Sequence, residues 1–203
     1  MKLLLTRHGE TDWNLARRYQ GQSDAPLNQT GIRQAEQLAN RLSKETVHAI
    51  YASDLSRAAV TAQLIAASRQ LEIKTDPRWR ELSFGQWEGL NYAEVDAQWH
   101  DRLTNWIANP VPSAPPEGES LMQLAERVQS ALDELKSNHK DDAVLVVSHS
   151  GVIQTLLCLV LGMDLKRYWQ FRVLQASLTI VSFHENGAVL NLFNEISHLK
   201  ALE

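Results

Sequence analysis

Two polar clusters, each containing a histidine, directly follow apolar runs in this sequence. The first includes Arg7 and His8, and the second holds His149 between two serines. A neutral imidazole nitrogen is well suited to attack a phosphomonoester dianion, because the dianion repels anionic nucleophiles. We therefore expect His8 to be a nucleophile toward phosphorus. Its other ring nitrogen should be held as an N–H donor by a backbone carbonyl near Gly9.

Three further side chains can neutralise the charge of a bound phosphate. Arg7 and Arg57 carry planar donor forks that match phosphate oxygens and stay charged at any working pH. Arg57 falls in the first turn of an expected helix, where the helix dipole disfavours a cation unless an anion binds there. The alternative is an arginine that lies along its own helix. His149 would add a hydrogen bond and, when protonated, a positive charge, although a lone histidine at a strand end is more often structural.

Hydrophobic periodicity and capping residues indicate the elements that must position these side chains. Strands are expected at residues 2–5, 49–52, 73–76, 143–147, 178–183 and 188–193, the last two joined by the hairpin signal Asn186-Gly187. Helices are expected after Asn28, Ser56 and Ser120 and over residues 91–108 and 152–161. This alternation predicts an α/β fold, a three-layer α/β/α sandwich with a mostly parallel central sheet and an antiparallel edge.

In such sheets, ligands bind at the carboxyl ends of the strands. Five candidate residues each follow an expected strand: Arg7, His8, Arg57, Glu81 and His149. We therefore expect them to converge on one crevice.

The chain length of 203 residues predicts a single domain over residues 1–203. Residues 91–118 are predicted to form a lid-like insert, a helix followed by a connector with four prolines. Trp99, Leu103, Trp106 and Ile107 could cover a ring-bearing leaving group, but a stripe at this spacing is also typical of ordinary core.

Composition excludes several classes of function. The formal net charge of -4 argues against a nucleic-acid or anionic membrane surface. No segment approaches the ~20 apolar residues of a membrane span, and the N-terminus lacks the apolar stretch of a signal peptide, so a cytoplasmic protein is expected. Cys158 is the only cysteine, which excludes a disulfide within the chain and a Cys-based zinc site.

Four segments resemble, in order, the motifs of the histidine phosphatase (phosphoglycerate mutase-like) superfamily: residues 5–14, 53–57, 81–89 and 148–151. The resemblance implies that Glu81 is the general acid, although Glu81 could instead pair with Arg80 or Arg78. It also implies an uncharged donor at Asn14. The substrate-binding residues it implies are Arg7, Asn14, Gly21, Arg57, His149 and Ser150.

We expect neither a metal nor another cofactor. The two arginines and His149 would neutralise charge as a metal ion does elsewhere. The seven histidines are scattered along the chain, and none forms a close ligand pair.

Within the family, hydrolysis is favoured over phosphoryl transfer between substrates. Arg102 is the only Lys or Arg between Trp99 and Glu117, whereas a mutase needs basic residues to grasp substrate carboxylates. A phosphoglycerate mutase-type phosphotransferase and a non-catalytic phospho-ligand-binding relative remain the alternatives.

The expected substrate is a small phosphorylated metabolite. Residues 116–120 and 171–181 resemble the alpha-ribazole phosphatase branch of cobalamin biosynthesis and its broad-specificity neighbours, which makes alpha-ribazole 5'-phosphate a candidate. A homodimer through a helix face or the hairpin edge is left open.

Overall fold

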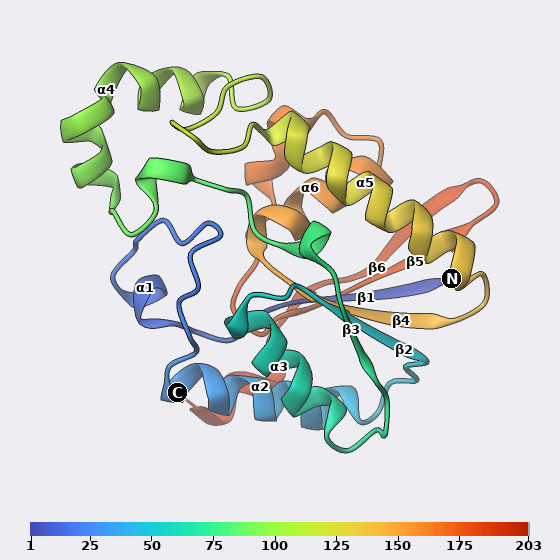
Figure 1. Cartoon of the computed structure of the whole chain (residues 1–203). Helices are drawn as coiled ribbons and strands as arrows, with labels where there is room; N and C mark the ends of the chain where they lie inside the picture. Colours follow the sequence, from blue (N-terminus) through green and yellow to red (C-terminus); the bar gives the residue numbers. More distant parts are fainter. Residues whose placement is uncertain (203) are drawn as a thin grey trace.

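A six-stranded sheet lies at the centre of the protein, which we describe over residues 1–202 from a computed structural model (Figure 1). The strand order is β3-β2-β4-β1-β5-β6. The first four strands are parallel to one another, β5 is antiparallel to β1, and β6 is antiparallel to β5. The strands are β1 (Lys2–Arg7), β2 (Ala49–Ala52), β3 (Ile73–Thr75), β4 (Ala143–Ser148), β5 (Leu178–His184) and β6 (Gly187–Glu195). The expected mostly parallel sheet with an antiparallel edge is confirmed.

Helices cover both faces of this sheet, so the expected three layers are also confirmed. Figure 1 shows α2 and α3 on one side and α5 and α6 on the other, with α4 standing farther out. The α-helices are α1 (Asp12–Leu15), α2 (Gln29–Leu42), α3 (Ser56–Ala66), α4 (Tyr92–Ala108), α5 (Leu121–Asn138) and α6 (Ser150–Val160). Short 3₁₀ helices are η1 (Pro77–Trp79), η2 (Gly85–Trp87), η3 (Leu165–Gln170) and η4 (Ser197–Leu202).

The strands are apolar at successive positions because each of their faces packs on a separate core. Leu4 joins the cluster under α2 and α3, whereas Leu3 and Leu5 join the cluster under α5 and α6. Strand β4 divides in the same way, since successive side chains of a strand point to opposite faces. A strand that is buried on both faces loses the polar alternation of a surface strand, which explains the continuous runs in the sequence.

The observed bounds differ from the expected ones in a few places. Strand β4 runs on to Ser148 and α6 begins at Ser150, so His149 alone separates them. Helix α4 is interrupted at Trp99, whose backbone is non-helical (φ -139, ψ 40). On α2, Gly31, Ala35 and Leu38 are buried, whereas Ile32 is 38% exposed.

The stripe of apolar residues on α4, for which both a lid and ordinary core were considered, divides between core and surface. Leu103 is only 1% exposed and belongs to the core, and Trp106 stacks edge-on against Trp87 and Phe84. Ile107 is 53% exposed and remains available at the surface. A lid function of residues 91–118 therefore stays a prediction. Fewer of their apolar side chains are free to cover a substrate than the sequence suggested.

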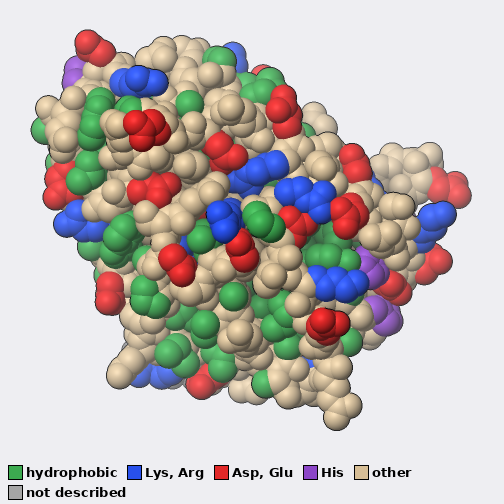
Figure 2. Space-filling view, in the orientation of Figure 1, with side chains coloured by type: hydrophobic (Ala, Val, Ile, Leu, Met, Phe, Trp, Pro, Cys, Tyr) green, Lys and Arg blue, Asp and Glu red, His purple; other side chains and the backbone are tan. Residues whose placement is uncertain are grey.

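On the face shown in Figure 2, acidic and basic side chains are intermixed, and no broad basic patch is seen on that face. In the part of the chain that the structure describes, no helix combines the length and apolar character needed to cross a membrane.

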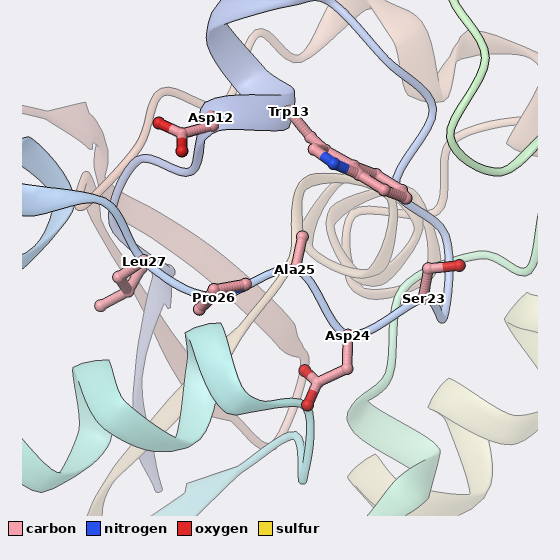
Figure 3. A pocket seen from close by; sticks show the side chains of 7 residues that line it. All are labelled: Asp12, Trp13, Ser23, Asp24, Ala25, Pro26 and Leu27. Atoms are coloured by element: carbon pink, nitrogen blue, oxygen red, sulfur yellow. The ribbon is translucent and has the colours of Figure 1, made fainter.

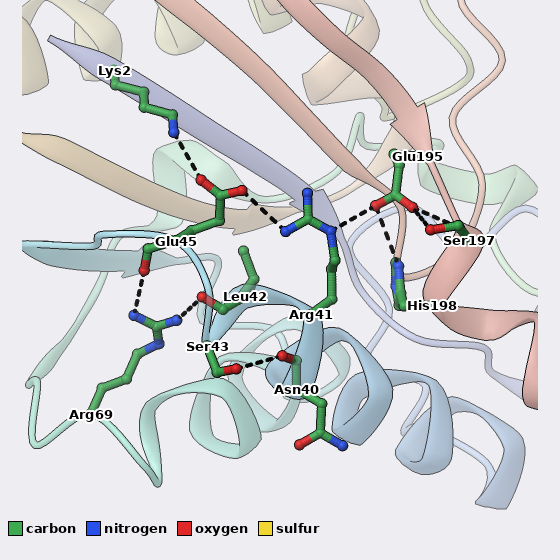
Figure 4. Close-up of polar contacts among 10 residues, drawn as sticks. All are labelled: Lys2, Asn40, Arg41, Leu42, Ser43, Glu45, Arg69, Glu195, Ser197 and His198. Atoms are coloured by element: carbon green, nitrogen blue, oxygen red, sulfur yellow. Dashed lines mark hydrogen bonds and ion pairs between the residues drawn. The ribbon is translucent and has the colours of Figure 1, made fainter.

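An ion-pair network joins three elements at the side of the sheet (Figure 4). Arg41 on α2 bonds Glu45 (Nη1–Oε1 3.0 Å) and Glu195 at the end of β6 (Nε–Oε2 3.2 Å). Lys2, the first residue of β1, bonds the other oxygen of Glu45 (2.9 Å). The hydrogen bond from Lys2 lowers the pKa of Glu45 below its ordinary value, and Arg41 contributes in the same direction.

This network predicts an acid-sensitive contribution to stability. Replacing Arg41 by Met should lower the free energy of unfolding at pH 7 by roughly 1 kcal/mol, because two partly buried carboxylates lose a charged donor. A carboxyl group with a lowered pKa stabilises the fold above its ordinary value of 4.5, and this contribution is lost as the pH falls through the lowered value. The difference between wild type and Arg41→Met, measured by urea unfolding, should therefore shrink below pH 4.5.

The control is Arg33→Met, since Arg33 is exposed on the same helix and bonds only Thr30 there. A difference that is equal at pH 7 and at pH 3.5, or as large for Arg33→Met, would contradict the role of the network.

Candidate active site

The parallel pairing of β1 with β4 places the two histidines side by side. Arg7 lies opposite Ser148 in the register, and the His8 backbone N–H donates to the Ser148 carbonyl at 3.0 Å. Each histidine is the first residue beyond its strand, and their ring centroids are 5.1 Å apart. The structure therefore brings the His8 and His149 clusters together at one edge of the sheet, as the sequence predicts.

The His8 ring is buried, with 2% of the residue exposed. Its Nδ1 lies 2.6 Å from the Gly9 carbonyl oxygen, in the contact expected from the sequence. A carbonyl only accepts, so Nδ1 carries the hydrogen and Nε2 keeps its lone pair. Burial lowers the pKa of His8 well below its ordinary value, and the charges of Arg7 and Arg57 lower it further. His8 is consequently neutral at neutral pH, as a nucleophile must be.

Glycine is required directly after His8 because the backbone of α2 approaches closely. A Cβ on Gly9 would lie 2.3 Å from the Gly31 carbonyl oxygen. The hydroxyl of Thr61 on α3 accepts from the Gly9 N–H (3.2 Å) and donates to the Arg57 carbonyl (2.8 Å). The loop that carries His8 is thereby held by two helices.

Both arginines are positioned by backbone carbonyls rather than by acidic side chains. Arg7 donates to the Val173 carbonyl at 2.8 Å, and Arg57 donates to the carbonyls of Ser23 (2.7 Å) and Gly21 (2.6 Å). Arg57 is fully buried, which rules out the alternative of an arginine lying along the surface of its own helix. Burial lowers the pKa of Arg7 to about 10, so Arg7 is still charged at neutral pH.

Several buried nitrogen atoms at this site have no hydrogen-bond partner within residues 1–202. They are the Nε atoms of Arg7 and Arg57 and both ring nitrogens of His149. Buried polar groups are nearly always paired, so an unpaired set in one place indicates a site for an anion. His149 is accordingly not the satisfied structural histidine of the alternative interpretation. Burial, followed by the charge of Arg57, lowers the pKa of His149 well below its ordinary value, so His149 is a neutral donor at neutral pH.

The Glu81 carboxylate lies at the N-terminus of α6. It accepts from the backbone N–H groups of Leu82 (2.9 Å) and Gly151 (3.1 Å), a position that the helix dipole favours. The alternative pairings of Glu81 are absent from the described residues. Arg80 bonds Asp54, and Arg78 bonds other carboxylates.

A cavity of about 150 Å³ lies among these groups. It is lined by Arg7, His8, Asn14, Arg18, Tyr19, Gln20, Gly21, Arg57, Glu81, Phe84 and Ser150. Every predicted site residue lines it except His149, which lies against the His8 ring. The Asn14 carboxamide oxygen accepts from the Thr11 N–H, leaving its amide nitrogen as a donor.

Sequence reasoning missed four of the lining residues: Arg18, Tyr19, Gln20 and Phe84. Arg18 donates to the Gly89 carbonyl (2.5 Å) and the Glu94 carboxylate (2.9 Å). Arg18, Tyr19 and Gln20 follow the segment 5–14 by a few positions and Phe84 lies within the segment 81–89, so proximity in sequence was the available signal. Glu88 was also missed; its carboxylate accepts from the backbone of Gln22, Ser23 and Phe84 and fixes the cavity wall.

A larger cavity of about 420 Å³ lies elsewhere, between Trp13 and residues 23–27 (Figure 3). Asp12 and Asp24 lie at its sides, and their charges would repel a phosphate dianion. Size alone therefore does not identify the site; the donors around His8 do.

No group of three or more metal-ligating side chains is found in residues 1–202. Cys158 is buried, and burial raises the pKa of its thiol to about 11, which makes it a core residue rather than a reactive one.

Residues 3–196 match the family model described as "Histidine phosphatase superfamily (branch 1)". Phosphoserine phosphatase 1 of Hydrogenobacter thermophilus is 35% identical over 199 residues, covering 98% of this chain and 94% of that protein. The probable phosphoglycerate mutase GpmB of Proteus mirabilis is 36% identical over 204 residues, covering 98% and 95%.

A similar solved structure is the alpha-ribazole phosphatase from Shigella flexneri, with a TM-score of 0.90, 30% identity and 96% of each chain covered. Fold, paired histidines and sequence agree, and the chain belongs to the histidine phosphatase superfamily.

Proposed function

We propose that this enzyme hydrolyses a small phosphomonoester through a phosphohistidine on His8. The observation that carries the proposal is the set of buried, unpaired donors around a neutral imidazole with a free Nε2. Donors held in a dry site stabilise developing negative charge at no cost of reorganisation.

In the first step, Nε2 of His8 attacks phosphorus, and the bond between phosphorus and the ester oxygen breaks. Arg7, Arg57 and His149 donate to the equatorial oxygens as charge spreads over them. Glu81 gives its proton to the departing oxygen, so that an alcohol leaves and Glu81 becomes a carboxylate.

In the second step, water attacks the phosphohistidine. Glu81 accepts a proton from that water, and the electron pair of the N–P bond returns to Nε2. Inorganic phosphate leaves, and both His8 and Glu81 are restored to their starting forms. The N–H groups of Leu82 and Gly151 orient the carboxyl group in both steps.

The cavity of about 150 Å³ favours a small substrate whose phosphate is enclosed and whose alcohol extends outward. The alcohol could reach a second, mainly apolar cavity of about 360 Å³ lined in part by Trp106, Ile107 and Tyr168. Burial, followed by the charge of Glu81, raises the pKa of Tyr168 in this second cavity to about 12. A ring-bearing alcohol such as that of alpha-ribazole 5'-phosphate fits this arrangement, and we propose it as one candidate.

A mutase is the second candidate, since one relative is named a probable phosphoglycerate mutase and Arg18 adds a cation to the cavity that could hold a substrate carboxylate. Against it, Glu94 already pairs with Arg18, and Arg102 is the only Lys or Arg between Trp99 and Glu117.

The mechanism predicts label on one histidine. After acid-free denaturing quench of a reaction with ³²P-labelled phosphomonoester, peptide mapping should find acid-labile phosphate on His8. His8→Ala should carry no label and lose activity by roughly three orders of magnitude or more. His100→Ala is the control, because His100 is exposed on α4. Label on a serine, or turnover by His8→Ala near the wild-type rate, would defeat the mechanism.

Chelation should leave the reaction intact. Activity measured after extensive dialysis against EDTA is expected to stay within about twofold of the untreated enzyme, because arginines rather than a metal ion neutralise the phosphate. Loss of activity on chelation with recovery on adding a divalent ion would revive a metal mechanism.

Hydrolysis and mutase activity can be separated by their products. With 3-phosphoglycerate and 2,3-bisphosphoglycerate, free phosphate should form in excess over 2-phosphoglycerate, and a parallel screen including phosphoserine and alpha-ribazole 5'-phosphate should rank the substrates. Dominant formation of 2-phosphoglycerate would overturn the choice of hydrolysis.

A further inference from the structure

Arg127 on α5 does not line the cavity, yet its guanidinium holds the segment that carries Glu81. Nη1 donates to the carbonyls of Arg78 (2.7 Å) and Arg80 (2.6 Å), and Nη2 donates to the carbonyl of Glu81 itself (2.8 Å). Three backbone carbonyls within four residues therefore converge on one side chain.

Glu119 completes this clamp, which we define as the pair Arg127 and Glu119. Its carboxylate accepts from Nε (2.7 Å) and Nη2 (2.8 Å) of Arg127. It also accepts from the Ser83 N–H (3.0 Å), and the Glu119 N–H donates to the Ser83 carbonyl (2.9 Å). The clamp thus grips the chain on both sides of Glu81.

All five N–H donors of Arg127 are used in these bonds, which is the full capacity of a guanidinium. A lysine offers three donors from one point and cannot reproduce the planar arrangement. The grip matters because Glu81 lies in a loop between η1 and η2, outside the sheet that positions the histidines.

We propose that Arg127, with Glu119, is a positioning residue that sets the general acid Glu81 for proton transfer to the leaving group. The inference rests on the proposed function, because it assigns Glu81 that role. Displacing a catalytic group by about 1 Å can cost on the order of 100-fold in rate, even when the change lies away from the chemistry.

The leaving group distinguishes this role from a purely structural one. A nitrophenolate departs readily without a proton, whereas a benzyl alkoxide needs one. Benzyl phosphate and 4-nitrophenyl phosphate are similar in shape, so their comparison isolates proton transfer. The ratio kcat/KM covers only the steps up to departure of the alcohol, so hydrolysis of the phosphohistidine does not affect it.

For Arg127→Lys, kcat/KM should fall by roughly 10- to 100-fold with benzyl phosphate and by less than about threefold with 4-nitrophenyl phosphate. Gly151→Ala should show the same selectivity by a separate route, because its Cβ would lie 2.4 Å from Glu81 Oε1 and displace that carboxyl group. This variant keeps the inference testable if Arg127→Lys does not fold, and Glu119→Gln gives a milder disruption of the clamp.

The double variant Arg127→Lys/Glu81→Gln tests whether Arg127 acts through Glu81. Adding Arg127→Lys to Glu81→Gln should change kcat/KM for benzyl phosphate by less than about twofold, since coupled residues are not additive. Arg41→Met is the matched control, a mostly buried arginine ion pair away from the site, and it should affect both substrates equally.

Equal losses with the two substrates in Arg127→Lys, or additive losses in the double variant, would overturn the positioning role while leaving Glu81 as the acid. A Glu81→Gln variant that treats both substrates alike, with His8 still labelled, would instead remove the acid assignment and the clamp's role with it. Absence of label on His8 would signal failure of the proposed function as a whole.

Discussion

The register of β1 against β4 is the constraint on which the site depends. Parallel strands bring their carboxyl ends to the same edge, and the pairing of Arg7 with Ser148 makes the next residue of each strand a neighbour of the other. A slip of one residue would turn every side chain of β1 to the opposite face and exchange its two cores. The apolar positions on both faces, Leu3 and Leu5 against Leu4, therefore specify where His8 lies.

The same arrangement gathers charge where a folded protein rarely tolerates it. Arg57 is a buried cation and His149 is a buried neutral imidazole, and neither is paired with a carboxylate in the described chain. Buried groups of both kinds cost stability unless something compensates. The carbonyls of Gly21 and Ser23 offset part of the cost for Arg57. A phosphate dianion would satisfy the remaining donors. The same unpaired donors therefore lower the stability of the free protein and provide affinity for the proposed substrate.

Much of this could be predicted from the sequence because it depends on local patterns. Capping residues such as Asn28 and Ser120, and runs of strand length, located the elements, and residues that follow strands located the site. Arg18 and Arg127 were missed for a physical reason: their key partners include backbone carbonyls, which leave no trace in residue types. The break at Trp99 was missed because tertiary packing, not periodicity, decides it.

The site combines two kinds of positioning. His8, the proposed nucleophile, and His149 follow directly from strands, where the sheet sets their places, whereas Glu81 reaches the same point from a loop between two 3₁₀ helices. A loop lacks the regular hydrogen bonds between strands that fix a sheet. The polar groups of this loop are instead bonded individually, by Arg127, Glu119 and the N-terminus of α6. Glu119 stands at the end of the proline-rich connector that follows α4. The proposed acid therefore depends on the segment that ends the connector after α4, whereas the proposed phosphate-binding residues Arg7, Arg57 and His149 do not. Substitutions in this connector can therefore change the rate at which different alcohols leave, without changing how the phosphate group is bound.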